Sequence, residues 1–303
     1  MLPTPLVLND RIRVFFAACD QSLRGRVFSV DLDLVNPTIV KSAVSRPILD
    51  LGLKGAFDAD GVNPCQIVRR DDKLLLYYVG WQRLTEDVPY TLFAGLAEST
   101  DDGATFQKVD DGQILHCADD ERFFRTAPFA FRDTEGWQML YIGGGEFLDG
   151  ASGKRLPTYH LCHTHSADGY RWSETTNLPL LSPLRENGQI GFGRPVLWND
   201  GDQPCLFISV RDEHGYSLQC VRETNGRLSW TDPLRGPIAA WESEMNCFGA
   251  PCRVGDWEFL FYNGNRFGAT GFGVARRPNS GSADAVSYSR LLNVLARETR
   301  SAG

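Results

Sequence analysis

A hairpin that opens with an X-Pro pair recurs five times along the chain, at Pro5, Pro64, Pro128, Pro195 and Pro251. Each copy runs through three or four mostly apolar residues, turns at Asp, Asn or Gly, and returns as a longer apolar strand. A strand tolerates proline at its opening, and a spacing of 56 to 67 residues leaves room for about four strands per repeat. Such units bury their faces best by packing radially around an axis. The sequence therefore predicts an all-β fold, a five-bladed β-propeller.

The C-terminal end departs from this repeat. Its segment SADAVSYSRLLNVLARETR has apolar residues near helical spacing, which predicts a short C-terminal helix from about Ala283. We therefore expect a propeller over residues 1–280 and a helical tail over residues 281–303. The helix either caps the last blade or joins two copies of the chain in a homodimer. The apolar residues are Val286, Leu291, Leu292 and Leu295.

Charge and hydropathy limit the kinds of molecule that the protein can bind and the cellular compartments in which we expect it. The formal net charge is −7, and Lys and Arg are scattered, so the protein's field would repel the phosphates of a nucleic acid. The N-terminal segment MLPTPLVLND lacks the basic and apolar regions of a signal peptide, and no later window resembles a membrane span. We expect a soluble, cytoplasmic protein that binds neither nucleic acid nor membrane.

The eight cysteines fit the same compartment. No Cys-x-x-Cys occurs, and Cys65, Cys162, Cys205 and Cys252 lie within apolar strand patterns. Cytosolic thiols of this kind are usually reduced and packed as small apolar groups. We therefore predict buried free thiols instead of a disulfide framework.

Several of these motifs resemble one known superfamily. They are FDADGVNPCQIVRRDDKLLLYYVGW (residues 57–81), the X-Pro openings, and the turns AESTDDGATF and HSADGYRW. Together they are similar to the five-bladed propeller superfamily of β-fructosidases, arabinanases, β-xylosidases and mannoside phosphorylases, over Met1 to Arg277. The resemblance implies an axial pocket that binds a sugar. It also implies carboxylates at the starts of the innermost strands, because glycoside chemistry needs one anion and one acid beside the scissile bond.

The positions that would carry those carboxylates differ from the superfamily. The Asp-Pro-Arg signature of the mannoside phosphorylases reads Asn63-Pro64-Cys65 here, which lacks both the acid and the arginine. Ordinary hydrolysis by two carboxylates is therefore not supported at these positions. The residues that precede the five prolines are Thr4, Asn63, Ala127, Arg194 and Ala250, and none is acidic.

Two arginines stand near the starts of inner strands. Arg125 precedes the third hairpin and Arg194 opens the fourth, so the family geometry would turn both toward one cavity. Guanidinium groups donate hydrogen bonds in pairs and stay charged when buried, which favours a sugar acid, a sugar phosphate or another small anion. The alternative is that each arginine pairs with a local acid, for example Arg125 with Asp120 or Glu121, and ties blades together.

Asp60 and Glu244 are the candidate catalytic acid and base, because each lies a few residues ahead of an inner strand. The alternative for the FDADG segment is a turn in which Asp58 and Asp60 accept hydrogen bonds from the backbone. The other candidate substrate-binding residues are Asn63, which stands where relatives keep a carboxylate, Asn246 ahead of the fifth hairpin, and Trp81, whose ring could stack on a sugar.

Three histidines in YHLCHTHSADG invite comparison with a metal site. Strand alternation puts His163 and His165 on one face and His160 on the other, and no acid stands at a partner spacing. We therefore predict structural histidines, no metal and no cofactor.

The preferred interpretation is a carbohydrate-active, glycosidase-like enzyme that acts on a small, anionic sugar or glycoside in the axial pocket. Two alternatives remain open. One is a propeller that binds a sugar or metabolite without catalysis, and the other is an enzyme with different chemistry on the same fold.

Overall fold

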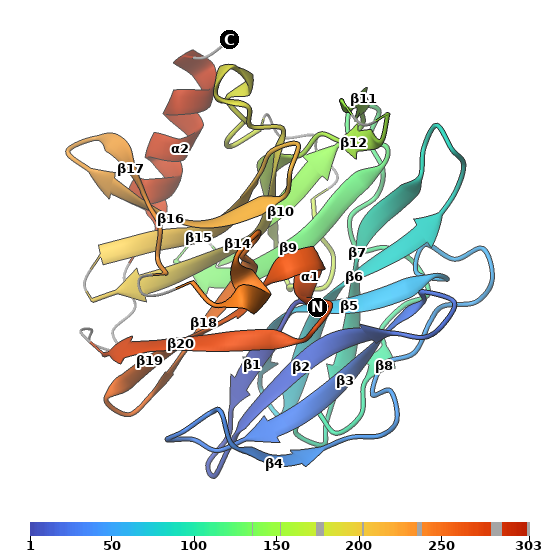
Figure 1. Ribbon diagram of the computed structural model, residues 1–303, viewed down its shortest axis with the longest axis vertical. Coiled ribbons are helices and arrows are strands. Elements are labelled where there is room, and N and C mark those ends of the chain that lie inside the picture. Colours follow the sequence, from blue (N-terminus) through green and yellow to red (C-terminus); the bar gives the residue numbers. More distant parts are fainter. Residues whose placement is uncertain are drawn as a thin grey trace.

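The structure, a computed structural model, describes residues 1–134, 136–151, 153–173, 179–201, 203–234, 238–279 and 287–301. Its strands form five antiparallel units in chain order (Figure 1). Unit 1 contains β1 (Thr4–Val7), β2 (Ile12–Cys19), β3 (Gly25–Leu32) and β4 (Val40–Ala43). Unit 2 contains β5 (Gly61–Arg70), β6 (Lys73–Arg83), β7 (Tyr90–Ser99) and β8 (Gln107–Lys108).

The remaining units follow the same plan with different additions. Unit 3 contains β9 (Phe124–Asp133), β10 (Gly136–Gly144) and β13 (His160–Ser166), with a hairpin of β11 (Phe147–Asp149) and β12 (Arg155–Pro157). Unit 4 contains β14 (Gly191–Asp200), β15 (Gln203–Arg211), β16 (Tyr216–Thr224) and β17 (Arg227–Thr231). Unit 5 contains β18 (Cys247–Val254), β19 (Trp257–Asn263) and β20 (Phe272–Pro278). The helices are η1 (Arg185–Asn187), η2 (Ala240–Glu242), α1 (Asn265–Gly268) and α2 (Ser289–Ser301).

The first strands of the five units close a ring. β1 contacts β5, β5 contacts β9, β9 contacts β14, β14 contacts β18, and β18 contacts β1. Short parallel pairings of β3 with β5 and of β7 with β9 also join units 1 to 3. A ring of antiparallel sheets is the arrangement of a β-propeller. The predicted all-β propeller with a short C-terminal helix is therefore confirmed.

Each sheet is buried because it lies between two neighbours. In the middle of β6, Leu74, Leu76 and Tyr78 pack in a cluster with side chains of unit 1. The alternate residues Leu75 and Tyr77 pack in a cluster with side chains of unit 3. Successive side chains of a strand point to opposite faces, so an apolar run without polar interruptions serves two interfaces at once.

Units 5 and 1 meet without a shared β-ladder. In the described part of the chain, no strand of unit 5 pairs with a strand of unit 1. Val14 of β2 instead lies in one apolar cluster with Phe259 and Phe261 of β19. One hydrogen bond also crosses this seam, from the Leu2 backbone N–H to Asn263 Oδ1 over 2.8 Å. Side-chain packing therefore closes the ring here.

The C-terminal helix α2 packs on β16 and β17 of unit 4 (Figure 1). Its side chains Leu291 and Leu295 are fully buried in the largest apolar cluster. One of the two expectations for this helix was that it caps the last blade. That position is wrong, because α2 covers unit 4 and not unit 5. Residues 280–286, which include Val286, the expected helix start and the expected domain boundary, lie outside the described residues.

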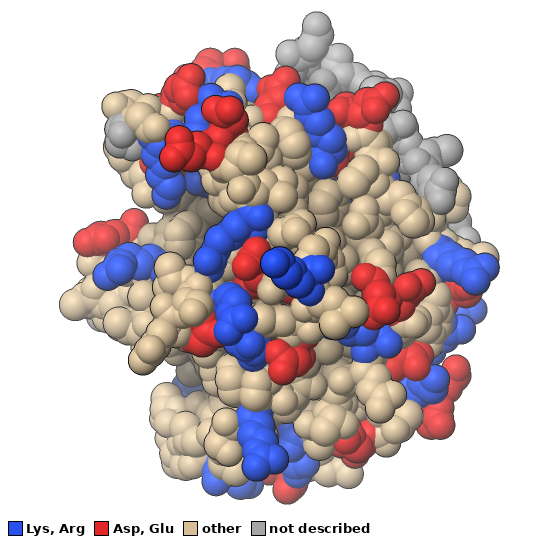
Figure 2. Space-filling view, turned by 90° about the vertical axis from the view of Figure 1, so that its right-hand side faces the viewer, with Lys and Arg blue, Asp and Glu red and all other residues tan. Residues whose placement is uncertain are grey.

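The surface charges, the helices and the cysteines can be compared with the expectations from the sequence. Figure 2 shows one face of the molecule, on which acidic and basic side chains are interspersed instead of gathered by sign. No helix among the described residues combines the length and the apolar character that a membrane crossing requires. All eight cysteines are free thiols, and six of them are buried.

Candidate functional site

A cavity of about 340 Å³ lies where the five units meet, and we call it the axial cavity. Every unit contributes residues at or next to its first strand: Leu2, Asn63, Ala127, Arg194 and Phe248. The propeller therefore presents the starts of its inner strands to one central space.

The inner strands bend at the cavity. Their pairing with the second strands shifts register at a β-bulge in units 2 to 5. Leu2, Ala127, Arg194 and Phe248 have φ values of 52°, 51°, 40° and 57°, and all four line the axial cavity. Bulges re-aim side chains, and positive φ is costly for a residue other than glycine. Backbone strain is thus concentrated around this space.

Arg194 lines the axial cavity and is 2% exposed. Its Nη1 donates to Pro3 O and Phe248 O over 2.8 and 2.9 Å, and its Nη2 donates to Thr4 Oγ1 and Cys65 O over 2.8 and 2.9 Å. One side chain of unit 4 therefore holds units 1, 2 and 5. Burial lowers the pKa of Arg194 to about 10, so the guanidinium remains charged at neutral pH.

A second arginine lines the wall of the cavity. Arg211 at the end of β15 is 8% exposed and lies over the rings of Tyr159 and Tyr216, at 5.8 and 5.4 Å from their centroids. Burial lowers the pKa of Arg211, but the phenolic oxygens of Tyr216, Tyr159 and Tyr90 outweigh this effect and raise it above its ordinary value. The exposed Lys154 adds a third cation to the lining.

The axial cavity contrasts its cations with a lack of carboxylates among the described residues that line it. Among the described residues that line the axial cavity there is no Asp or Glu. Arg194, Arg211 and Lys154 form no ion pair with any described carboxylate. A buried positive charge without a protein counterion favours an anionic ligand, because such a ligand supplies the missing charge.

Two buried polar atoms of residues that line the axial cavity also lack hydrogen-bond partners among the described residues. Arg194 Nε and Thr126 Oγ1 are buried and have no hydrogen-bond partner among the described residues. Buried polar groups are normally hydrogen-bonded, so these two atoms are exceptions next to the cavity. Seven aromatic side chains line the cavity and offer flat apolar surfaces to a ring; they are Trp81, Tyr90, Tyr159, Phe192, Tyr216, Phe248 and Phe267.

Asn63 and Trp81, two of the residues expected to bind substrate, both line the axial cavity. Neighbouring glycines make room for them. A Cβ atom on Gly61 would lie 1.7 Å from Trp81 Nε1, and one on Gly25 would lie 3.2 Å from Asn63 Oδ1. The indole therefore depends on the absence of a side chain at position 61.

The two predicted catalytic acids lie apart from this cavity. Asp60 Oδ2 accepts a hydrogen bond from the backbone N–H of Arg83 at the end of β6 over 2.8 Å, so it satisfies a backbone donor of the neighbouring strand and not one of a local turn. Asp58 is buried and pairs with Lys108 Nζ over 2.6 Å. Glu244 is exposed and lines a neighbouring cavity of about 360 Å³, which we call the outer cavity. Asp60 lines neither cavity.

Two other predicted binding residues have local partners. Asn246 Oδ1 accepts a hydrogen bond from the Leu218 backbone N–H over 2.9 Å. Arg125 does not line the axial cavity, and the expected common cavity with Arg194 is wrong. Its Nε instead donates to Glu121 Oε2 over 2.5 Å, so the pairing with a local acid is the arrangement observed.

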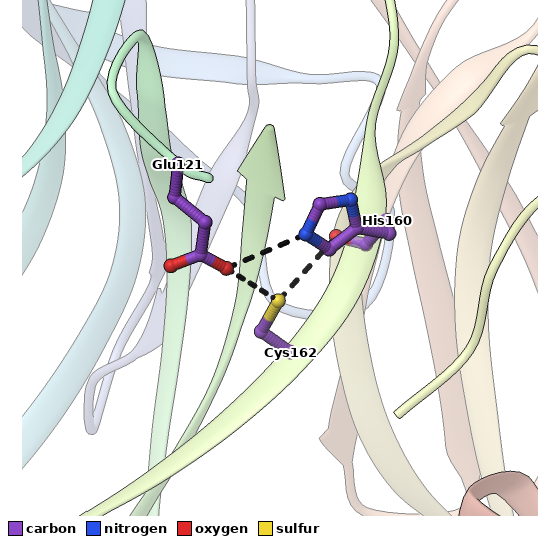
Figure 3. A group of neighbouring side chains, drawn as sticks. All are labelled: Glu121, His160 and Cys162. Atoms are coloured by element: carbon purple, nitrogen blue, oxygen red, sulfur yellow. Dashed lines mark hydrogen bonds and ion pairs between the residues drawn. The ribbon is translucent and has the colours of Figure 1, made fainter. Parts of the chain in front are cut away.

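Glu121 is the centre of a second buried group (Figure 3). It receives hydrogen bonds from Arg125, from Tyr141 Oη over 3.0 Å and from Cys162 Sγ over 2.9 Å, and His160 Nε2 lies 3.4 Å from it. Burial alone would raise the pKa of Glu121. The hydrogen bonds from His160 and Cys162 and the charge of Arg125 outweigh burial and hold this pKa below its usual value.

Sequence reasoning missed this group because its members are far apart in the chain. His160 and Cys162 are two residues apart on β13 and so share one face of that strand, whereas Glu121 precedes β9. No acid stands at a partner spacing to His160 in the sequence, but the fold brings Glu121 to within 3.4 Å of it. His163, by contrast, is hydrogen-bonded through Nε2 to Gln138 Oε1 over 2.7 Å.

Comparisons with known proteins agree with the fold. No protein-family model matches the chain. Two uncharacterized proteins of Mycobacterium tuberculosis are similar to this chain: MT1551 of strain CDC 1551 / Oshkosh and Rv1502 of strain ATCC 25618 / H37Rv. Each is 27% identical to it over 283 residues, which is 90% of this chain and 91% of theirs. A solved glycoside hydrolase has a TM-score of 0.68 at 16% identity and covers 94% of this chain and 89% of its own. The α-L-arabinofuranosidase from Lactobacillus brevis has a TM-score of 0.66 at 11% identity, with coverages of 94% and 91%. The resemblance to the propeller glycosidases is thus confirmed as a likeness of fold.

Proposed function

We propose that the axial cavity binds a small ring-shaped anion, such as a sugar acid or a sugar phosphate. The observation that carries this proposal is that Arg194, Arg211 and Lys154 line the cavity, whereas no described Asp or Glu does. Arginine recognises carboxylates and phosphates through paired donors, and the aromatic walls suit the faces of a sugar ring. A neutral sugar would leave the charge of Arg211 and Lys154 uncompensated.

Turnover of such a ligand is the second step of the proposal. Glycoside chemistry requires carboxylates, and the axial cavity has none among its described residues. The outer cavity is lined by Asp212, Glu213 and Glu244, and it shares Lys154, Arg211, Tyr216 and Phe267 with the axial cavity. Asp212 accepts hydrogen bonds from the backbone of its own turn, which leaves Glu213 and Glu244 as the candidate acids. A glycoside whose anionic ring occupies the axial cavity would extend past Arg211 toward these two acids. The alternative is a propeller that binds the anion without cleaving anything.

The binding step is tested by thermal unfolding with glucuronate, glucose 6-phosphate and glucose. A ligand at 100 times its Kd stabilises the folded state by about 2.7 kcal/mol, which corresponds to roughly 5 °C in Tm. We expect this shift with the two anions and not with glucose. Lys154→Ala should reduce it without loss of basal stability, because Lys154 is exposed.

The matched control is Lys54→Ala, which removes an exposed lysine that lines neither cavity. Its shifts should equal those of the unmodified protein. Equal shifts with glucose and with the anions would reject an anion-selective cavity. An anion shift that survives in Lys154→Ala at full size would remove this lysine from the binding site.

The catalytic step is tested with nitrophenyl glycosides of sugar acids. We expect Glu244→Gln to lower kcat at least about 100-fold, because a positioned acid or base contributes that much. Asp87→Asn, which changes an exposed acid of the β6–β7 loop, should leave kcat unchanged. Ligand binding with no turnover in any variant would favour the non-catalytic alternative.

A further inference from the structure

Glu121, His160 and Cys162 bring three different metal-ligating groups together (Figure 3). Glu121 Oε1 lies 2.9 Å from Cys162 Sγ and 3.4 Å from His160 Nε2. All three ligand atoms lie within 4.8 Å of one another. Around a tetrahedral zinc ion, with bonds of about 2.0 to 2.3 Å, such atoms are separated by roughly 3.3 to 3.6 Å. Shifts of less than about 1 Å would therefore seat an ion between them.

The donor set selects the kind of ion. A thiolate, an imidazole and a carboxylate are the three ligand types that proteins use for zinc. Calcium and magnesium take oxygen ligands and do not favour the sulfur of Cys162. The set therefore fits a first-row transition metal with zinc-like preferences.

The carboxylate is already oriented for this role. Glu121 Oε2 accepts hydrogen bonds from Arg125 Nε over 2.5 Å and from Tyr141 Oη over 3.0 Å. These contacts fix one oxygen and direct the other, Oε1, toward Cys162 and His160. Outer hydrogen bonds of this kind commonly orient metal-binding carboxylates. An ion pair with Arg125 alone explains the position of Oε2 but not the convergence of the thiol and the imidazole on Oε1.

The group also has access from outside. Glu121 and Cys162 are buried, but the His160 side chain is 22% exposed and lines a cavity of about 330 Å³. His160 is thus the ligand through which the group borders the cavity, and a water ligand on an ion bound here would lie on that side. Three protein ligands plus one open position is the pattern of catalytic zinc sites.

We propose that Glu121 Oε1, His160 Nε2 and Cys162 Sγ bind one zinc-like metal ion, with the fourth position open to the cavity beside His160. This site is independent of the axial cavity and of the function proposed for it.

Titration of the metal-free protein with Co²⁺ tests this site, because thiolate coordination produces a charge-transfer band in the near ultraviolet. We expect saturation at one ion per chain, together with that band. Cys162→Ser should abolish the band, and His160→Ala should weaken Co²⁺ binding by about 100-fold or more, since loss of a ligand costs at least as much as loss of its supporting partner. Circular dichroism verifies that both variants fold. His160 is partly exposed, so His160→Ala keeps the test valid if Cys162→Ser does not fold.

The matched controls remove the same side-chain types elsewhere. Cys117 and His165 are exposed, so Cys117→Ser and His165→Ala should retain both the band and the affinity. Three results would overturn the site: no saturable binding of Co²⁺, a band that persists in Cys162→Ser, or an affinity that His160→Ala leaves unchanged.

Discussion

Replacement of Arg194 by methionine is expected to lower the free energy of unfolding by about 3 to 5 kcal/mol. Arg194 donates hydrogen bonds to four acceptors in three other units, and methionine would leave these acceptors buried and unpaired. Removal of the buried charge relieves its desolvation, but the loss of four charge-assisted hydrogen bonds is larger. Urea unfolding monitored by tryptophan fluorescence measures the difference through the midpoint.

Two further variants sharpen this result. Arg194→Lys keeps the positive charge but cannot donate the paired hydrogen bonds of a guanidinium group. Its loss of stability should therefore be smaller than that of Arg194→Met. Arg227 is exposed on β17, and Arg227→Ala should change stability by no more than about 0.5 kcal/mol. An Arg194→Met variant within about 1 kcal/mol of the unmodified protein would contradict a role for Arg194 in holding the units.

Replacement of Arg125 by methionine should cost a similar amount, about 3 to 5 kcal/mol at pH 7, for a different reason. Arg125 is 2% exposed and pairs with Glu121, so its loss would leave a carboxylate buried without its counterion. The destabilisation should be measured by urea unfolding at pH 7 and again near pH 4.5.

The destabilisation by Arg125→Met should depend on pH through the ionisation of Glu121. In the unmodified protein the pKa of Glu121 is lowered from its usual 4.5, so its ionised form stabilises the fold above that pH, and this contribution is lost as the pH falls through the lowered pKa. Without Arg125 the buried Glu121 protonates at higher pH. The cost of Arg125→Met should therefore shrink as the pH falls from 7 toward 4.5. A cost that is equal at both pH values would show that packing, and not the ion pair, sets the effect.

The fold followed from local signals in the sequence. The five X-Pro hairpins carry their own strand starts and turns, and the alternating interfaces of β6 require only that successive side chains point to opposite faces. The position of α2 did not follow, because helical spacing identifies the apolar face of the helix but not the unit that covers it. Leu291 and Leu295 contact a cluster formed largely by units 3 and 4.

The site was predictable only in part. Asn63 and Arg194 line the axial cavity because the starts of the inner strands point to the axis, and Trp81 lines it from the end of β6. Arg211 could also have been found, since an antiparallel hairpin sets the end of its second strand beside the start of its first, and Arg211 pairs with Gly191. The convergence of Glu121 on His160 depends on how loops fold around unit 3, and no spacing in the sequence encodes it.

Closing the ring at the seam between units 5 and 1 has a large cost in chain entropy. The hydrogen bond from Leu2 to Asn263 joins residues 261 positions apart, and closing a flexible loop of that length costs roughly 5 kcal/mol of chain entropy. No backbone ladder offsets this cost among the described strands. It is met by the apolar cluster of Val14 with Phe259 and Phe261 and by the contacts of Arg194 with Pro3, Thr4 and Phe248. Leu2, Arg194 and Phe248 line the axial cavity and also make the contacts that hold units 5 and 1 together, so a ligand in this cavity would act on the closure of the ring.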